Sequence, residues 1–189
     1  MKKPISMNHL NKKCIGLHNF FCGNLSSTTM LKEGSRILSD LKFQILQEGK
    51  PQVITSDQVF SGKKVVLFGL PGAFTPTCSR QHLPGFGQKV DEIKSKGVDT
   101  VACLAVNDPF VLQQWAESQG VAGKILMLAD GGAQSVKKLG LDIDTGDFGG
   151  IRCRRFSSLI DNFVVKKIHL EEGTGFSGAS SAETILKDL

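Results

Sequence analysis

Short, nearly unbroken apolar runs alternate along the chain with longer segments of helical character. Unbroken apolar runs bounded by turn residues are typical of strands buried on both faces. The pattern predicts strands at 37–46, 52–55, 65–70, 98–106, 125–128, 156–161 and 163–170, and helices at 56–60, 76–96, 108–119, 133–139 and 180–189. Strands separated by helices predict an α/β fold whose central sheet is mostly parallel and covered by helices on both faces.

Turn and breaker residues refine several of these elements. Asn162 lies between two strand patterns and predicts a hairpin, which adds antiparallel strands and makes the sheet mixed. Asp108 should cap the helix that Pro109 opens. The pair Pro84-Gly85 falls inside the helix at 76–96, so this helix should be kinked or interrupted there.

The composition fits a single domain with one ordinary core, since 40% of the 189 residues are hydrophobic. No apolar run approaches the roughly 18 residues that a membrane-spanning helix needs, so no membrane partner is expected. Five of the 23 basic residues lie in residues 1–32, which hold none of the 18 acidic residues. The remaining 18 basic and 18 acidic residues balance, so the net charge of +5 belongs to the N-terminal segment. A neutral body without a basic patch argues against nucleic-acid binding.

Residues 1–30 differ in composition from the rest, and we expect a separate segment there, followed by one domain at 31–189. The segment contains lysine, asparagine, serine, threonine and phenylalanine, and has no acidic residue. Such a composition is similar to that of mitochondrial or plastid targeting segments, although these are usually rich in arginine. The alternative is a disordered tail, with true initiation at Met30. We expect a mitochondrial protein, with a cytoplasmic location as the alternative.

The five cysteines are widely and irregularly spaced: Cys14, Cys22, Cys78, Cys103 and Cys153. An odd number at irregular spacing does not match the disulfide framework of a secreted protein. A reducing compartment with catalytic thiol chemistry fits this pattern better.

The surroundings of Cys78 predict a reactive thiol. The apolar run 65–70 should be a buried strand, and a turn at Pro71-Gly72 follows it. Thr75 is the expected N-cap of the next helix and Pro76 suits its first position, which places Cys78 in the first turn. Unpaired amides and the positive end of the helix dipole favour a thiolate over a thiol there.

A hydroxyl and a thiolate three residues apart lie on the same side of a first helical turn, where they can hold and attack a small polar oxidant. The alternative is a capped helix with a buried and inert cysteine. Strand, turn, cap and cysteine agree, so the reactive interpretation is preferred. No second cysteine lies close enough to Cys78 to form the C-x-x-C pair of a dithiol exchanger.

Zinc is a competing use of the same side chains. Cys78 and His82 are four residues apart and could share a helix face, but no second pair of ligands has a finger-like spacing. We therefore expect no metal, and we expect His82 to be a hydrogen-bonding structural histidine.

Several segments of the chain resemble those of a known family. The segment PGAFTPTCS is similar to the reactive loop of peroxiredoxins, and HLPGF after it narrows the resemblance to the type II (peroxiredoxin-5-like) branch. Three later segments keep the resemblance in register: GVDTVACLAVNDPFVLQQWA, RRFSSLID and LEEGTGFSGASSAETIL. The resemblance extends over residues 31–189 and implies a thioredoxin-like fold, with a mixed central sheet flanked by helices.

The resemblance also implies the site. Its threonine, its peroxidatic cysteine and a distant arginine fall on Thr75, Cys78 and Arg155. The family implies Pro71 as a shield for the cysteine and a histidine near the site, here His82. It implies a thiol peroxidase for hydrogen peroxide and alkyl hydroperoxides that needs no cofactor, because the sulfur is both nucleophile and electron donor.

Physical reasoning alone does not choose between Arg152, Arg154 and Arg155, and only the resemblance favours the last. A guanidinium beside the sulfur would favour the thiolate and would bind the departing oxygen as negative charge develops on it.

The sequence leaves several candidates for the thiol that reduces the oxidised Cys78. No cysteine follows Cys153, so the C-terminal resolving cysteine of animal-like members is absent. Cys103 lies 25 residues after Cys78, the spacing of plant-like members, but it is expected in mid-strand. Cys153 is expected in a loop and is a third candidate. We expect external reduction by glutathione and glutaredoxin, with thioredoxin as the next candidate.

The expected partners are therefore peroxides and a thiol reductant, and a homodimer is left open. Thiol–disulfide exchange on the same fold, or redox sensing without turnover, are the alternative functions.

Overall fold

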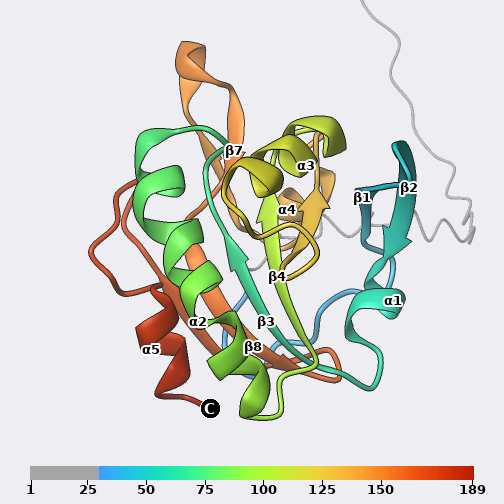
Figure 1. Cartoon of the computed structure of the whole chain (residues 1–189), viewed down its shortest axis with the longest axis vertical. Helices are drawn as coiled ribbons and strands as arrows, with labels where there is room; N and C mark the ends of the chain where they lie inside the picture. The colour runs from blue at the N-terminus through green and yellow to red at the C-terminus, as the bar shows by residue number, and fades with distance from the viewer. Residues whose placement is uncertain (1–29) are drawn as a thin grey trace, which may run out of the picture.

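The computed structural model describes residues 30–189 and is built around a central sheet (Figure 1). Within this range seven strands pair in the order β2-β1-β5-β4-β3-β8-β9. They are β1 (Lys42–Gln47), β2 (Lys50–Thr55), β3 (Lys64–Gly69), β4 (Thr100–Ala105), β5 (Leu126–Ala129), β8 (Phe156–Asp161) and β9 (Val164–Leu170). The helices are α1 (Ser56–Phe60), α2 (Leu83–Ser95), α3 (Pro109–Ser118), α4 (Gln134–Lys138) and α5 (Ala182–Leu186).

The sheet is mixed, and helices flank it, as predicted. Parallel pairing is confined to β3, β4 and β5 at its centre, whereas the other pairs are antiparallel. The expectation of a mostly parallel sheet is therefore wrong. The reason is that β1 and β2 form a hairpin, as do β8 and β9, and a hairpin connection forces antiparallel pairing.

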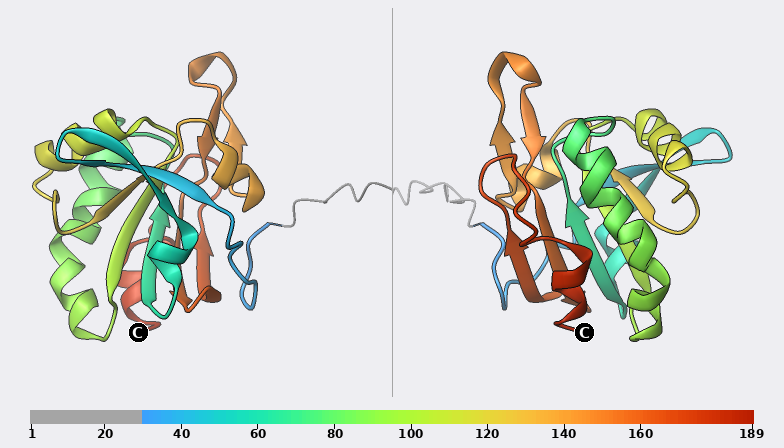
Figure 2. Two further views of the ribbon diagram at one scale, coloured as in Figure 1. Left: turned by 90° about the vertical axis from the view of Figure 1, so that its right-hand side faces the viewer. Right: turned by 60° about the vertical axis from the view of Figure 1, so that its left-hand side comes forward.

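Helices lie on both faces of the sheet (Figure 2), and a layer of buried apolar side chains covers each face. Side chains from α2, α3 and α5 pack on one face, and side chains from α1 and α4 pack on the other. Strand β3 contributes to both layers, because Val66 and Phe68 point to the first and Val65 and Leu67 to the second. Complete burial on both faces explains why β3 is an unbroken apolar run rather than an alternating one.

The expected strand at 37–46 begins only at Lys42. The residues before it run along the other edge of the sheet, where Gly34 and Ile37 donate backbone hydrogen bonds to the carbonyls of Val165 and Phe163. Ile37 is only 2% exposed, so its apolar character reflects burial at this edge and not membership of β1.

The helix expected at 76–96 is irregular before Pro84 and not at it. Residues 78–82 form a π-helical turn, η1 (Cys78–His82), and α2 starts at Leu83. The amide of Leu83 donates to the carbonyl of Cys78, five residues earlier. A proline lacks an amide and its ring collides with the carbonyl four residues before it, so a wider turn just upstream accommodates Pro84.

A small hairpin was missed by the sequence pattern. Strands β6 (Asp142–Asp144) and β7 (Ile151–Cys153) pair with each other, with the 3-10 turn η2 (Gly146–Phe148) between them. The hairpin stands out from the body in both views of Figure 2. Three-residue strands give too little alternation to be recognised from sequence, although glycines mark the turn between them.

The expectation of a targeting segment or disordered tail at the N-terminus concerns residues that, apart from Met30, lie outside the described part of the chain. Within residues 30–189, no helix is long and apolar enough to cross a membrane.

Candidate active site

Cys78 lies at the start of η1, directly after the loop that leaves β3. Its side chain is 0% exposed. The amide of Ser79 donates to the Thr75 carbonyl at 3.0 Å, which closes the first helical turn. The preceding amides of that turn have no carbonyl four residues earlier within the helix, so the amide of Cys78 can face a ligand. The sequence prediction of a cysteine in a first helical turn is confirmed.

The loop before this turn is held in an unusual backbone conformation. Phe74 has a φ of 59°, in the left-handed region that bulky residues rarely adopt. The amide of Ala73 donates to Asn107 Oδ1 at 3.1 Å, which anchors the loop to the end of β4. Asp108, next to Asn107, caps α3 by accepting from the amides of Phe110 and Val111, as predicted.

Thr75 does not cap the helix with its side chain as expected. Its hydroxyl donates instead to the carbonyl of Gly72 at 2.8 Å. With its proton committed to Gly72, the oxygen keeps lone pairs that can accept from a ligand in the adjacent pocket. Thr75 therefore lies where the sequence placed it but interacts differently.

Arg155 precedes β8 and is the arginine that contacts the sulfur. Its Nη2 lies 3.5 Å from Cys78 Sγ and 3.1 Å from the Thr174 carbonyl, and its Nε donates to the Gly175 carbonyl at 2.8 Å. The side chain is only 1% exposed. Among the described residues no carboxylate lies within ion-pair distance of it. A buried cation without an anion is costly, and a thiolate at Cys78 would supply the missing negative charge.

The other two arginines are placed differently. Arg152 donates to the carbonyls of Gly149 and Val106, and Arg154 Nε has no hydrogen-bond partner within residues 30–189. The three-dimensional structure thus shows which of the three arginines contacts the sulfur, a choice that the sequence alone did not allow.

His82 ends the turn that Cys78 begins, and it contacts the other terminal nitrogen of Arg155. Its Nε2 is 3.0 Å from the Ser180 carbonyl, and its Nδ1 is 3.2 Å from Arg155 Nη1. A carbonyl can only accept and a guanidinium can only donate, so the imidazole is neutral with its proton on Nε2. Burial lowers the pKa of His82 to about 4, and the positive charge of Arg155 acts in the same direction. His82 therefore supports the guanidinium as a hydrogen-bond acceptor.

The lowered pKa of His82 predicts a loss of stability in mild acid. The unfolded chain takes up a proton at this imidazole near pH 6.5, whereas the folded protein does so only near pH 4. The contribution of neutral His82 to the free energy of unfolding is present above pH 6.5. It is lost as the pH falls towards 4, and the total loss is about 3 kcal/mol. Urea unfolding followed by circular dichroism at several pH values measures it. The pH dependence between 6.5 and 4 should flatten in His82→Gln, and an unchanged slope would contradict this role.

A pocket of about 640 Å³ opens beside these residues. Pro71, Thr75 and Arg155 form part of its wall, and Ile143 and Phe148 of the β6–β7 hairpin extend it outward. Cys78 is fully buried and lies behind this wall, in contact with Arg155.

The other two described cysteines are also buried. Cys103 is in β4, in the same apolar layer as Cys78, whereas Cys153 belongs to the layer on the opposite face of the sheet. The expectation that Cys153 lies in a loop is wrong, because it is in β7 and 0% exposed. Burial raises the pKa of both thiols, so neither is readily ionised.

Two supporting contacts had no signal in the sequence. Trp115 Nε1 in α3 donates to Ser79 Oγ at 3.0 Å, next to the reactive cysteine. Glu171, after β9, is 3% exposed and accepts hydrogen bonds from Ser177 and Ser180. Only a long-range fold brings these partners together, so local patterns do not reveal them.

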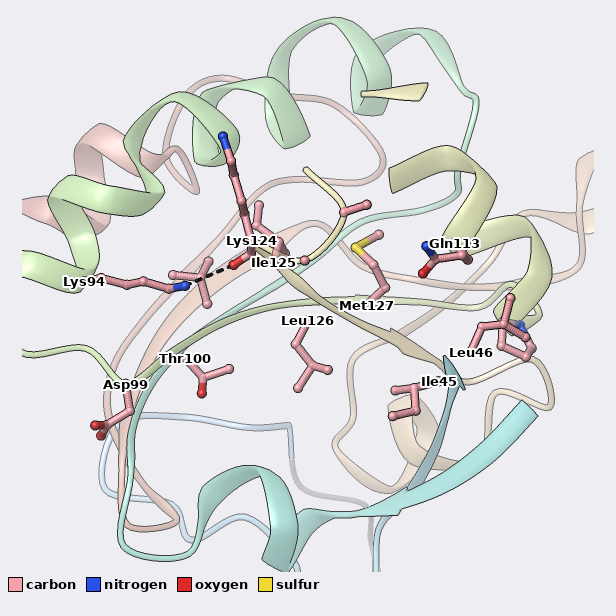
Figure 3. Close-up of a pocket in the computed structure, with 14 residues that line it drawn as sticks. Ile45, Leu46, Lys94, Asp99, Thr100, Gln113, Lys124, Ile125, Leu126 and Met127 are labelled. Atoms are coloured by element: carbon pink, nitrogen blue, oxygen red, sulfur yellow. Dashed lines mark hydrogen bonds between the residues drawn. The ribbon is translucent and has the colours of Figure 1, made fainter. Parts of the chain in front are cut away.

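A second hollow, of about 390 Å³, lies away from Cys78 between β1, β5 and the start of α3 (Figure 3). Lys94 Nζ points across it to the Lys124 carbonyl. Asp99, at its edge, already accepts from the amide of Lys64. Its lining includes no cysteine, so it offers no thiol for peroxide chemistry. No group of three or more potential metal ligands comes together within residues 30–189.

Comparison with known proteins agrees with this geometry. The family model described as Redoxin matches residues 32–186. The chain is 43% identical over 154 residues to the chloroplastic peroxiredoxin-2E of Arabidopsis thaliana, which covers 80% of this chain and 65% of the relative. It is 49% identical over 143 residues to peroxiredoxin-2C of Oryza sativa subsp. japonica, which covers 75% of this chain and 88% of the relative. The chain spans 65% and 64% of the length of two chloroplastic relatives, slightly less than two thirds.

A solved structure is similar over nearly its whole length. The crystal structure of reduced Prx3 in complex with H2O2 from Vibrio vulnificus is 45% identical, with a TM-score of 0.79, covering 84% of this chain and 99% of that one. The match to the family model, the identities and this structural likeness agree with the resemblance of the reactive loop. The chain belongs to the Redoxin family and, within it, to the peroxiredoxins of the type II branch.

Proposed function

We propose that this protein is a thiol peroxidase in which Cys78 reduces peroxides. The observation that carries the proposal is the buried guanidinium of Arg155, which lies 3.5 Å from Cys78 Sγ and has no carboxylate partner among the described residues. The Cys78 thiolate attacks one peroxide oxygen, so an S–O bond forms and the O–O bond breaks. The sulfur is oxidised to sulfenic acid. The other oxygen leaves with the electron pair, takes up a proton and departs as water or an alcohol.

Each neighbouring group has a role in this step. Arg155 favours the thiolate and donates to the oxygen on which negative charge develops. Thr75 Oγ, whose own proton is given to Gly72, accepts from the peroxide O–H. The amide of Cys78 is a further donor at the helix start, and Pro71 in the pocket wall shields the sulfur.

We propose hydrogen peroxide and alkyl hydroperoxides as the substrates. The reduced Prx3 of Vibrio vulnificus, 45% identical to this chain, was crystallised with H2O2. A pocket of about 640 Å³ is far larger than hydrogen peroxide needs, and Ile143 and Phe148 give its outer part an apolar wall. An alkyl chain could lie against that wall while the peroxide group faces Thr75 and Arg155.

We propose that an external thiol, glutathione with glutaredoxin or else thioredoxin, reduces the sulfenic acid. Cys103 is fully buried in a central strand, and Cys153 is on the opposite face of the sheet. A disulfide brings two α-carbons within about 7 Å, so either internal route needs local unfolding of a packed core. A small thiol entering from solvent avoids that cost.

This route predicts that Cys103→Ser and Cys153→Ser each keep most of the glutaredoxin-supported turnover. Intact-mass analysis after one equivalent of peroxide should show sulfenic acid at Cys78, and a glutathione adduct once glutathione is added. A Cys78–Cys103 disulfide that forms as fast as turnover would instead establish an internal route.

We further propose that residues 1–29 direct the protein to an organelle. Their composition, with several lysines and no acid, supports a targeting role, and two relatives are named as chloroplastic. A mitochondrial destination remains our first choice over the cytoplasm. A fusion of these residues to a fluorescent protein that stays in the cytosol would refute the targeting role.

A homodimer is the assembly we propose. Phe74 and Phe110 are 56% and 54% exposed. With Leu46 and Val111 they line a shallow hollow of about 430 Å³. Exposed apolar patches of this kind favour association. Sedimentation velocity that finds only monomer at all concentrations would contradict it.

A further inference from the structure

Glu171 is a buried carboxylate that takes no direct part in the proposed reaction. It directly follows β9, is 3% exposed and accepts four hydrogen bonds. Oε1 accepts from the amide and hydroxyl of Ser180, at 2.9 and 3.1 Å. Oε2 accepts from the amide and hydroxyl of Ser177, at 2.9 and 2.6 Å. Burial alone would raise the pKa of Glu171, but these hydrogen bonds outweigh it and lower the pKa to about 2. The group is therefore an anion at neutral pH.

The segment that this carboxylate ties down provides one wall of the site. Three of its backbone carbonyls face the active-site side chains. Those of Thr174 and Gly175 accept from Arg155, and that of Ser180 accepts from His82 Nε2. Glu171 also donates its own amide to the Arg155 carbonyl at 3.0 Å.

Few other contacts within residues 30–189 hold this segment in place. Residues 172–175, 177 and 179 are exposed, and Phe176 is half-buried, 5.2 Å from the His82 ring and 5.8 Å from the Arg155 guanidinium. Outside the segment, Thr184 Oγ1 donates to the Gly178 carbonyl at 3.0 Å. The backbone hydrogen bonds within the segment, from Gly175 to Glu172 and from Ser181 to Gly178, each close a short turn. The carboxylate thus fixes the segment at Ser177 and Ser180, while the amide of Glu171 anchors its start to Arg155.

We propose that Glu171 is a positioning residue: it holds residues 172–180 so that their carbonyls aim Arg155 at Cys78. Arg155 Nη2 is shared between the Thr174 carbonyl and the sulfur, so a shift of the segment moves the donor away from the sulfur. The inference rests on the proposed peroxidase function, but its geometric part concerns the thiolate and not the peroxide.

The test is Glu171→Gln in the full chain. An amide of the same shape keeps one acceptor oxygen, so either Ser177 or Ser180 loses the acceptor for its backbone amide. Two readouts are expected to change. The single-turnover rate of Cys78 oxidation by hydrogen peroxide should fall about tenfold or more, as for a donor displaced from a transition state. The pH at which iodoacetamide alkylation of Cys78 is half-maximal should move upward.

Two further variants keep the test decisive. Glu172→Gln changes an exposed neighbour of equal charge and should behave as wild type. Ser177→Ala removes one hydroxyl but leaves the backbone donor in place, so it should fold and show a smaller change in the same direction. This variant decides the matter if Glu171→Gln does not fold.

The outcomes separate the inference from the proposed function. If folded Glu171→Gln, or Ser177→Ala in its place, keeps both the wild-type oxidation rate and the wild-type alkylation profile, the positioning role is refuted. An equal loss in Glu172→Gln would refute it too, since a general charge effect would then be the cause. If the wild-type protein does not react with peroxide, the peroxidase function fails, and the alkylation profile alone still decides whether Glu171 positions Arg155.

Discussion

Cys78→Ser is expected to abolish peroxide consumption, with a loss of at least about a thousandfold, as when other enzymes lose their nucleophile. A serine hydroxyl is not ionised at neutral pH and is a far weaker nucleophile than a thiolate. Its oxygen also cannot take up the peroxide oxygen as sulfur does in forming sulfenic acid. The side chains are close in size, so the fold should remain. Peroxide consumption coupled to glutathione, glutaredoxin and NADPH oxidation measures the effect.

Cys103→Ser is the matched control for that experiment, since it also exchanges a fully buried sulfur for oxygen. Turnover that survives in Cys78→Ser would show that another group reduces peroxide. A wild-type protein that is oxidised once at Cys78 but does not turn over with any thiol donor would be a redox sensor and not a peroxidase.

Arg155→Lys is expected to slow the oxidation of Cys78 about a hundredfold, close to 2.7 kcal/mol of transition-state stabilisation. Lysine keeps the positive charge but loses the planar fork, and a single ammonium cannot reproduce the geometry that contacts the sulfur, two carbonyls and His82. The pH for half-maximal alkylation of Cys78 should rise, since a less well-aimed cation favours the thiolate less. Stopped-flow oxidation and iodoacetamide alkylation measure the two effects.

Arg154→Lys is the control, because Arg154 is the neighbour whose Nε has no partner within residues 30–189. Equal losses in the two variants would show a general effect of replacing an arginine between β7 and β8, and not a specific role of the Arg155 fork. A wild-type oxidation rate in Arg155→Lys would contradict the role given to the guanidinium fork.

The part of the site that could be predicted from the sequence consists of residues that are close together in the chain. A strand, a turn, Pro76 and a cysteine are neighbours in the chain, so the helix start at Cys78 followed from their order. The cap was misjudged because the Thr75 hydroxyl had two partners within reach and a sequence does not show which one it takes.

Long-range contacts explain the rest. Arg155 is 77 residues from Cys78, and only the pairing of β8 with β3 brings them together. The same holds for Ser180, which is 98 residues from His82. In the fold, the unbroken apolar runs located β3 and β4 correctly, whereas β6 and β7 were too short to give a recognisable pattern.

The contact between Trp115 and Ser79 gives the protein a built-in optical reporter. Trp115 is the only tryptophan and the chain has no tyrosine, so ultraviolet emission excited at 295 nm comes from this one indole. Its N–H is bound to the hydroxyl next to Cys78, and its ring is fully buried. We expect a movement that brings the sulfur out to a reductant to disturb that hydrogen bond and to change the polarity around the ring. Intrinsic fluorescence should then follow the oxidation and reduction of Cys78 in real time, without a label.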